Sequence, residues 1–306
     1  MDNPLLARFP GVIGFPVTPF SANEGVDAGA FRENLEFMLN SELAALTCCG
    51  SNGELQSLTL DEYRVVAEMA GTTIGGKKGL ILGVGQTLRT AQEQARIARK
   101  AGADAVIIMA PYTADSNEPG IAEYYRRVAG EAEIPAFLYQ TKWSGVLPLS
   151  LLDRLTDVEN ICMVKDEHGS LSHYLNVRVR FGDRFYWVNG MAEPFVPSYW
   201  NLGARTFTSG LACFMPQITG QIFQLAMKGD FTGINELLDE IVVPLYEIRN
   251  RKPGYKVSMI KAAMDLAGLK GGKVRPPLID LSVEDRADLE GLMSRTGLLR
   301  AGTVLA

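Results

Sequence analysis

The sequence has no apolar run long enough to cross a membrane as a helix. Its first residues, Met1-Asp2-Asn3-Pro4, also lack the basic and apolar regions of a signal peptide. These two absences predict a cytoplasmic protein that has no membrane partner.

Paired cysteines and clustered basic residues are also missing. The four cysteines, Cys48, Cys49, Cys162 and Cys213, include no Cys-x-x-Cys pair, so we expect buried thiols rather than disulfides or a metal site. The formal net charge of −5 comes without a block of lysines and arginines, which argues against a nucleic-acid partner.

What the sequence does have is a regular alternation of short apolar runs with longer amphipathic segments. This pattern is typical of βα units around a parallel sheet, and about eight units can be counted. The expected strands are 12–17, 44–49, 80–84, 105–109, 136–139, 161–165, 186–189 and 203–207. Eight units predict a (β/α)8 TIM barrel, and the alternative is a doubly wound sheet with a helical domain.

Capping signals and a helical tail refine this prediction. Asp27 is expected to cap a helix, and Thr59-Leu60-Asp61-Glu62 has the form of a capping box. Tail helices are expected at 216–228, 231–249, 256–267 and 282–294. We expect the barrel to span residues 1–228 and a C-terminal helical extension, packed on the barrel, to span 229–306.

The predicted strand 161–165 ends on a lysine. A strand buried on both faces is normally apolar, and lysine is rarely buried without a partner. Lys165 is therefore either the first solvated residue after the strand or a desolvated amine with a lowered pKa. Only the desolvated amine would be neutral enough to attack a carbonyl and form a Schiff base. Lys256 and Lys261 are alternative amines, expected to face solvent or cap the barrel mouth.

Further polar groups are expected at the same end of the barrel, where such folds carry their catalytic residues. The strand before Lys165 ends at Tyr139, so the two side chains should reach one substrate. The loop Gly50-Ser51-Asn52-Gly53 follows the second strand, and its glycines would let backbone amides turn inward around a carboxylate. Each feature alone has a plainer interpretation, as a core tyrosine and a simple turn.

These residues resemble the dihydrodipicolinate synthase and N-acetylneuraminate lyase family of class I aldolases. The motifs that carry the resemblance are Phe15-Pro16-Val17-Thr18-Pro19-Phe20, Gly50-Ser51-Asn52-Gly53-Glu54, Leu138-Tyr139, Val164-Lys165-Asp166 and Pro276-Pro277-Leu278. The resemblance implies that Lys165 forms a Schiff base with a 2-oxo acid, that Tyr139 relays protons, and that the protein is a homotetramer without a cofactor. The candidate substrate-binding residues are Gly50, Ser51, Asn52, Gly53 and Ser209.

Within the family, two C-terminal stretches look most like the 5-dehydro-4-deoxyglucarate dehydratases. They are Ile248-Arg249-Asn250-Arg251-Lys252-Pro253-Gly254-Tyr255 and Val274-Arg275-Pro276-Pro277-Leu278. This likeness implies a lyase that removes water and carbon dioxide from a sugar diacid and leaves 2,5-dioxopentanoate.

The sequence also departs from both groups. Thr113 stands where the synthases usually have a second tyrosine, and no arginine follows Tyr139 closely, which counts against synthase activity. Gln140 and Asn52 replace the usual asparagine and threonine of the dehydratases. A retro-aldol lyase, a synthase-like enzyme on pyruvate and a non-catalytic 2-oxo acid binding protein therefore stay open.

Two other chemistries are weaker alternatives. His168 with Asp166 and Glu167 could bind a metal, but these residues are nearly consecutive rather than spaced for one ligand face. Gly83-Val84-Gly85 lacks the third glycine of a dinucleotide-binding fingerprint. Neither a metal nor a nucleotide cofactor is expected.

Overall fold

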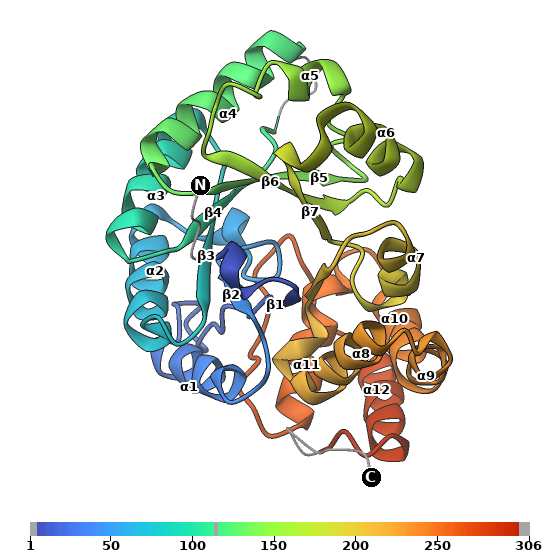
Figure 1. Cartoon of the computed structure of the whole chain (residues 1–306). Coiled ribbons are helices and arrows are strands. Elements are labelled where there is room, and N and C mark those ends of the chain that lie inside the picture. Colours follow the sequence, from blue (N-terminus) through green and yellow to red (C-terminus); the bar gives the residue numbers. More distant parts are fainter. Residues whose placement is uncertain (1–4, 113–115, 300–306) are drawn as a thin grey trace.

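The computed structural model describes residues 5–112 and 116–299. Within them, eight parallel strands close into a barrel, each pairing with the next and β8 pairing with β1 (Figure 1). The strands are β1 (Gly11–Gly14), β2 (Ala45–Cys48), β3 (Gly79–Val84), β4 (Ala105–Ile108), β5 (Ala136–Thr141), β6 (Ile161–Glu167), β7 (Tyr186–Asn189) and β8 (Thr206–Ser209). The predicted TIM barrel is confirmed, and the doubly wound alternative is wrong because the sheet closes.

Helices follow the strands and surround the barrel (Figure 1). They are α1 (Ala28–Leu39), α2 (Leu60–Ile74), α3 (Leu88–Lys100), α4 (Glu118–Ala132), α5 (Leu149–Asp153), α6 (Leu171–Phe181), α7 (Val196–Asn201) and α8 (Pro216–Lys228). Short 3-10 helices are η1 (Leu6–Arg8), η2 (Leu55–Ser57), η3 (Gly182–Arg184), η4 (Glu193–Phe195) and η5 (Leu211–Cys213).

The sequence signals for two helix starts are confirmed. The Asp27 side chain accepts a hydrogen bond from the amide of Ala30 at the start of α1. At the start of α2, Thr59 and Glu62 satisfy each other's backbone amides as a capping box. These N-caps set where α1 and α2 begin and so fix the lengths of the loops after β1 and β2.

Apolar side chains fill the inside of the barrel. Ile13, Ile81, Ile107, Phe137 and Val188 are buried there, one from each of five strands. Lys165 lies against this layer, since it lines the same small internal space. The strands are therefore apolar on both faces, as their sequences predict, and the lysine sits on a water-poor surface.

Strands β5 and β6 run two residues further than predicted. Their register pairs Tyr139 with Lys165 and Thr141 with Glu167, so Lys165 is not the end of its strand. The prediction stopped at Lys165 because charged residues follow it. Those residues stay in the strand because Glu167 is ion-paired and Asp166 is fully hydrogen-bonded.

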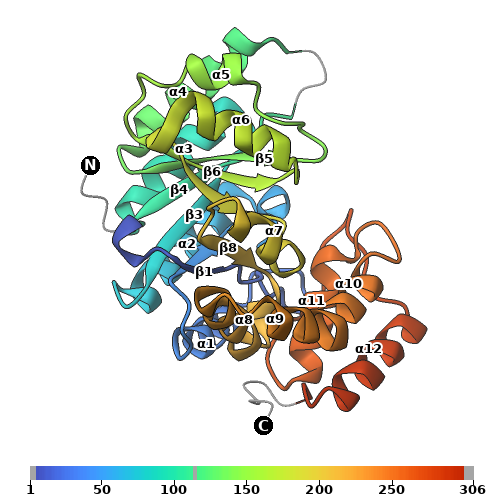
Figure 2. The same cartoon turned by 45° about the vertical axis from the view of Figure 1, so that its right-hand side comes forward.

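The C-terminal extension packs on the barrel beside α7 and α8 (Figure 2). Its helices are α9 (Phe231–Leu237), the π-helix η6 (Leu238–Val242), α10 (Val243–Arg249), α11 (Tyr255–Leu266) and α12 (Val283–Arg295). The single helix predicted for 231–249 is interrupted by η6. Pro244 explains this, because it has no amide hydrogen to bond to the carbonyl of Glu240.

The structure also bears on the predictions about membrane spans and cysteines. None of the helices in residues 5–112 and 116–299 is long and apolar enough to span a membrane. The described cysteines form no disulfide. Cys48, Cys49 and Cys213 are buried as predicted, whereas Cys162 is half-buried. The N-terminal residues 1–4 and Thr113, which entered the sequence interpretation, lie outside the described residues.

Candidate active site

Lys165 lies on β6 with only 3% of its surface exposed. Its Nζ atom sits between two aromatic rings, 4.4 Å from the centre of Phe15 and 4.1 Å from the centre of Tyr139. Burial lowers the pKa of Lys165 to about 8, with Glu167 opposing the shift and Lys256 adding to it. The solvated interpretation of this lysine is therefore wrong, and a useful fraction of the amine is neutral near neutral pH.

Tyr139 is the register partner of Lys165 on the neighbouring strand, so the two side chains lie together as expected. Its hydroxyl donates a hydrogen bond to Glu167. Burial, and then the negative charge of Glu167, raise the pKa of Tyr139 well above the ordinary value, while a hydrogen bond to the Ser51 side chain acts in the opposite sense. The phenol therefore stays protonated and sits in a chain of polar groups.

Glu167 was considered in the sequence analysis only as a possible metal ligand, and its place beside Lys165 was missed. Side chains alternate along a strand, so Lys165 and Glu167 point to the same face of β6. Lys165 Nζ is 3.0 Å from a Glu167 carboxylate oxygen, and Lys256 from α11 is hydrogen-bonded to the other oxygen. Burial raises the pKa of Glu167, but the positive charges of the two lysines outweigh it and hold the pKa far below the ordinary range.

Asp166, between them, points to the opposite face and organises the loop after β6. Its carboxylate accepts hydrogen bonds from Gln140, Tyr199 and the amides of His168 and Gly169, at 2.5 to 3.1 Å. Gln140, which departs from the family pattern, thus holds the loop that follows the lysine strand. No group of three possible metal ligands occurs in the described ranges.

The loop after β2 lies across the barrel from β6, and Ser51 and Asn52 line the central cavity. Within the described chain, the backbone amides of these two residues donate to no protein acceptor, whereas the Asn52 side chain donates to the carbonyl of Phe15. The sequence suggested that the two glycines would take the unusual backbone conformations of this loop. The left-handed conformation is instead found at Cys49 and Glu54. Gly53 serves close packing instead, since a Cβ there would lie 3.0 Å from the backbone nitrogen of Cys49.

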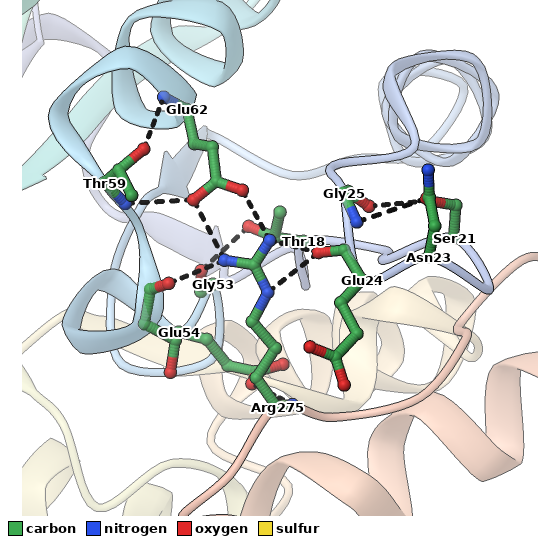
Figure 3. A network of polar contacts seen from close by, with 11 residues as sticks. Thr18, Ser21, Asn23, Glu24, Gly25, Gly53, Glu54, Thr59, Glu62 and Arg275 are labelled. Carbon is green, nitrogen blue, oxygen red and sulfur yellow. Dashed lines mark hydrogen bonds and ion pairs between the residues drawn. The ribbon is translucent and has the colours of Figure 1, made fainter.

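A polar network fastens this loop to the C-terminal extension (Figure 3). Buried Glu54 pairs with Lys261 of α11 at 2.6 Å and accepts a hydrogen bond from the amide of Arg275 at 3.1 Å. The Arg275 guanidinium in turn bonds the carboxylate of Glu62 and the carbonyl of Glu24 (Figure 3). The expectation that Lys261 faces solvent or caps the mouth is wrong, because it is 1% exposed and paired.

Ser209 and Gly50 stand beside the cavity rather than on its surface. Ser209 is buried, its hydroxyl accepts the amide hydrogen of Ala212 at 2.9 Å, and its neighbour Thr208 lines the cavity in its place. Gly50 packs against Phe15, where a Cβ would come within 3.2 Å of the ring. Both residues shape the walls that hold the lining groups.

The cavity at the carboxyl ends of the strands has a volume of about 750 Å³ and holds Lys165, Tyr139 and Glu167 on one surface. The extension supplies part of its wall. Arg249 of α10 lines the cavity with its guanidinium 4.6 Å from the ring centre of Tyr246, and it forms no ion pair in the described ranges. Lys256 lines the mouth, as one of the two positions expected for it, whereas sequence reasoning missed Arg249 as a site residue because its position depends on how the tail packs.

A model of the dihydrodipicolinate synthetase family matches residues 8–296. This chain belongs to that family. Three relatives bear the name probable 5-dehydro-4-deoxyglucarate dehydratase. Those from Oceanobacillus iheyensis and Bacillus subtilis are 33% identical over 290 and 288 residues and match 93% of this chain, with 94% and 93% of their own lengths covered. The third, from Acinetobacter baumannii, is 33% identical over 290 residues, 94% of this chain and 95% of its own.

Solved structures of family members share the fold. Dihydrodipicolinate synthase from Bacillus clausii superposes with a TM-score of 0.89 at 26% identity, over 96% of this chain and 100% of its own. N-acetylneuraminate lyase from Fusobacterium nucleatum gives a TM-score of 0.83 at 22% identity, over 93% of this chain and 98% of its own. The family resemblance expected from the motifs is confirmed.

Proposed function

We propose that this protein removes water and carbon dioxide from 5-dehydro-4-deoxyglucarate and leaves 2,5-dioxopentanoate, through a Schiff base on Lys165. Membership of the dihydrodipicolinate synthetase family supports the chemistry, and the names of the relatives support the substrate. The observation that carries the proposal is the buried Lys165 amine, with a lowered pKa, beside the Tyr139 hydroxyl in a cavity of small-molecule size.

The first stage is condensation of the amine with the ketone. Neutral Lys165 attacks the carbonyl carbon, and water leaves to form an iminium. The phenol of Tyr139, held beside the amine, is placed to give and take protons at the reacting carbon and at the departing oxygen. No external cofactor is needed, because the lysine itself becomes the electron sink.

The second stage uses that sink. The iminium acidifies the adjacent carbon, and loss of a proton gives an enamine whose electrons expel the β-hydroxyl as water. The conjugated iminium that results accepts the electron pair of the carbon–carboxylate bond, and carbon dioxide leaves. The dienamine left by decarboxylation takes up a proton and its enol becomes the aldehyde. Hydrolysis of the final imine then frees Lys165 and releases 2,5-dioxopentanoate.

The cavity offers partners for both ends of a diacid. The amides of Ser51 and Asn52, on the loop after β2, suit the carboxylate next to the ketone. Arg249, half-buried on α10, is a cation for the distal carboxylate, and Lys142 adds a positive charge at the exposed mouth. Cations from the barrel and the extension therefore draw a dianionic substrate into one pocket.

We further propose a cytoplasmic homotetramer, on the resemblance to the family. The four cysteines support a reducing compartment, since those described form no disulfide. Two aromatic side chains at the mouth, Tyr112 and Trp143, are stacked 4.9 Å apart yet are 71% and 56% exposed. An exposed aromatic pair of this kind suits a contact between subunits.

Product analysis tests the proposed function. Purified protein is incubated with 5-dehydro-4-deoxyglucarate, carbon dioxide is measured, and the organic product is identified by NMR. Equal yields of carbon dioxide and 2,5-dioxopentanoate are expected. Release of pyruvate would instead indicate retro-aldol cleavage, and adduct formation without turnover would indicate a 2-oxo acid binding protein.

A further inference from the structure

The carboxylate of Glu167 is the meeting point of the polar groups in the site. The hydroxyl of Tyr139 donates to one of its oxygens, and the ammonium of Lys165 lies 3.0 Å from the same oxygen. Lys256 of α11 binds the other oxygen. One carboxylate oxygen thus accepts hydrogen bonds from both the amine and the phenol. An ion pair that only stabilised the fold would not need to contact the phenol as well.

A carboxylate in this position works against the nucleophile. Burial lowers the pKa of Lys165 and makes the amine reactive, but the negative charge of Glu167 raises it again. An apolar residue at 167 would leave Lys165 more often neutral. The carboxylate therefore impairs the condensation step, and a compensating role is expected in a later step of the same reaction.

We propose that Glu167 is a catalytic residue that receives the substrate proton through Tyr139. The inference rests on the proposed function, because it concerns the enamine formed after the Schiff base. Glu167 lies on the same face of β6 as Lys165, so its carboxylate oxygen stays beside the nitrogen of the iminium and the carbon next to it.

The proton path balances without any further reagent. The carbon–hydrogen bond next to the iminium breaks, its proton passes to the Tyr139 oxygen, and the Tyr139 proton passes to Glu167. The electron pair stays in the enamine. When the β-hydroxyl leaves, the same proton returns by the same route and makes water. Both transfers run along the hydrogen bond from the Tyr139 hydroxyl to Glu167.

The alternative role for Glu167 is purely structural, as an anchor between β6 and α11 through Lys256. The two roles differ in which reaction step they affect. A proton acceptor is needed for enamine formation but not for the iminium itself. An anchor, in contrast, would disturb the position of Lys165 and so affect both steps together.

The Glu167→Gln variant separates these steps, because glutamine keeps the shape and loses the basic oxygen. Pyruvate serves as the probe. Iminium formation is followed by borohydride trapping at Lys165, and enamine formation by exchange of the pyruvate methyl protons with D2O in NMR. We expect trapping to persist and to extend to lower pH. Without the negative charge of Glu167, the pKa of Lys165 falls further and the amine is neutral at lower pH. Exchange should fall about 100-fold or more.

Matched variants control the experiment. Glu290→Gln, an exposed site on α12, should leave both rates unchanged. Glu167→Asp should recover part of the exchange, because the carboxylate is retained. If Glu167→Gln does not fold, Lys256→Met keeps the carboxylate but raises its pKa, and the acid limb of the exchange profile should then move to higher pH.

The outcomes are distinguishable. If Glu167→Gln exchanges protons at the wild-type rate, or loses trapping and exchange in equal measure, Glu167 is not the proton acceptor and the inference is overturned while Lys165 keeps its role. If the acid limb of the exchange profile does not move in Lys256→Met, the inference is likewise overturned. If wild-type protein is not trapped at Lys165 by any 2-oxo acid, the proposed function fails and the inference fails with it.

Discussion

At the scale of single residues, the site depends on how much water reaches Lys165. The rings of Phe15 and Tyr139 on either side and the apolar layer below it remove solvent from the ammonium group. This desolvation favours the neutral amine. The negative charge of Glu167 raises the pKa of Lys165, but the net pKa shift is downward, so burial has the larger effect.

The pH dependence of Schiff-base formation follows from this balance. The reactive species is the neutral amine, and the pKa of Lys165 is lowered to about 8. Below that pH the neutral fraction grows about tenfold per pH unit, and above it the fraction levels off. The initial rate of iminium formation with pyruvate should therefore rise with pH up to about 8 and then plateau. A rate still rising up to the ordinary lysine pKa would show an amine that is not desolvated.

Residue types and strand ends were enough to predict part of the site. The positions of Lys165 and Tyr139 at the ends of adjacent apolar runs predicted their contact, and the register confirms it. Glu167 was missed because a charged residue after a lysine looked like the start of a loop. The two-residue period of a strand, applied beyond Lys165, would have placed Glu167 on the same face.

At the scale of elements, the loop after β2 owes its position to a buried ion pair with α11. Glu54 and Lys261 are both removed from water, so each charge depends on the other. Breaking such a pair by removing one partner leaves an uncompensated charge, which costs more than the pair contributes. The loop that presents Ser51 and Asn52 is therefore tied to a helix more than two hundred residues away in sequence.

The Lys261→Met variant tests this tie. It should lower the free energy of unfolding by about 3–5 kcal/mol, because the Glu54 carboxylate stays buried without its cation. Urea denaturation measures the change. Lys270→Met, which removes a lysine from a solvent-exposed pair with Glu33, is the matched control and should have little effect. Equal effects of the two variants would contradict the importance of the buried pair.

Sequence patterns identified most elements but not how the tail meets the barrel. The caps at Asp27 and Thr59 located the starts of α1 and α2. The contributions of Arg249 and Lys256 to the cavity are tertiary, since no local pattern records which face of a tail helix lies over the mouth. An interruption of the helix near Pro244 could have been predicted from the sequence, because an internal proline removes a helical hydrogen bond.

At the scale of the whole molecule, we propose a boundary between α8 and α9, with the barrel at 1–228 and the extension at 229–306. Gly229 ends α8 with a φ of 73°, a conformation that glycine adopts easily. The extension is not an independent module in function, because α10 and α11 supply part of the cavity wall. In the proposed mechanism the barrel provides the reactive amine, and the extension provides cations around it.

The proposed tetramer gives a prediction at this scale. Light scattering after size-exclusion chromatography should give a mass close to four times the 33.4 kDa of one chain. Replacing the exposed Trp143 with serine should reduce the fraction of tetramer, if subunit contact covers the aromatic pair. A monomeric mass at micromolar concentration would contradict the assembly.

The most direct test of the whole account is to identify the lysine that forms the Schiff base. Protein is incubated with pyruvate, reduced with borohydride, digested and mapped by mass spectrometry. We predict one adduct, on the peptide that carries Lys165, and its loss in a Lys165→Arg variant. An adduct on Lys256 or Lys261, or no adduct at all, would contradict the assignment of Lys165 as the nucleophile.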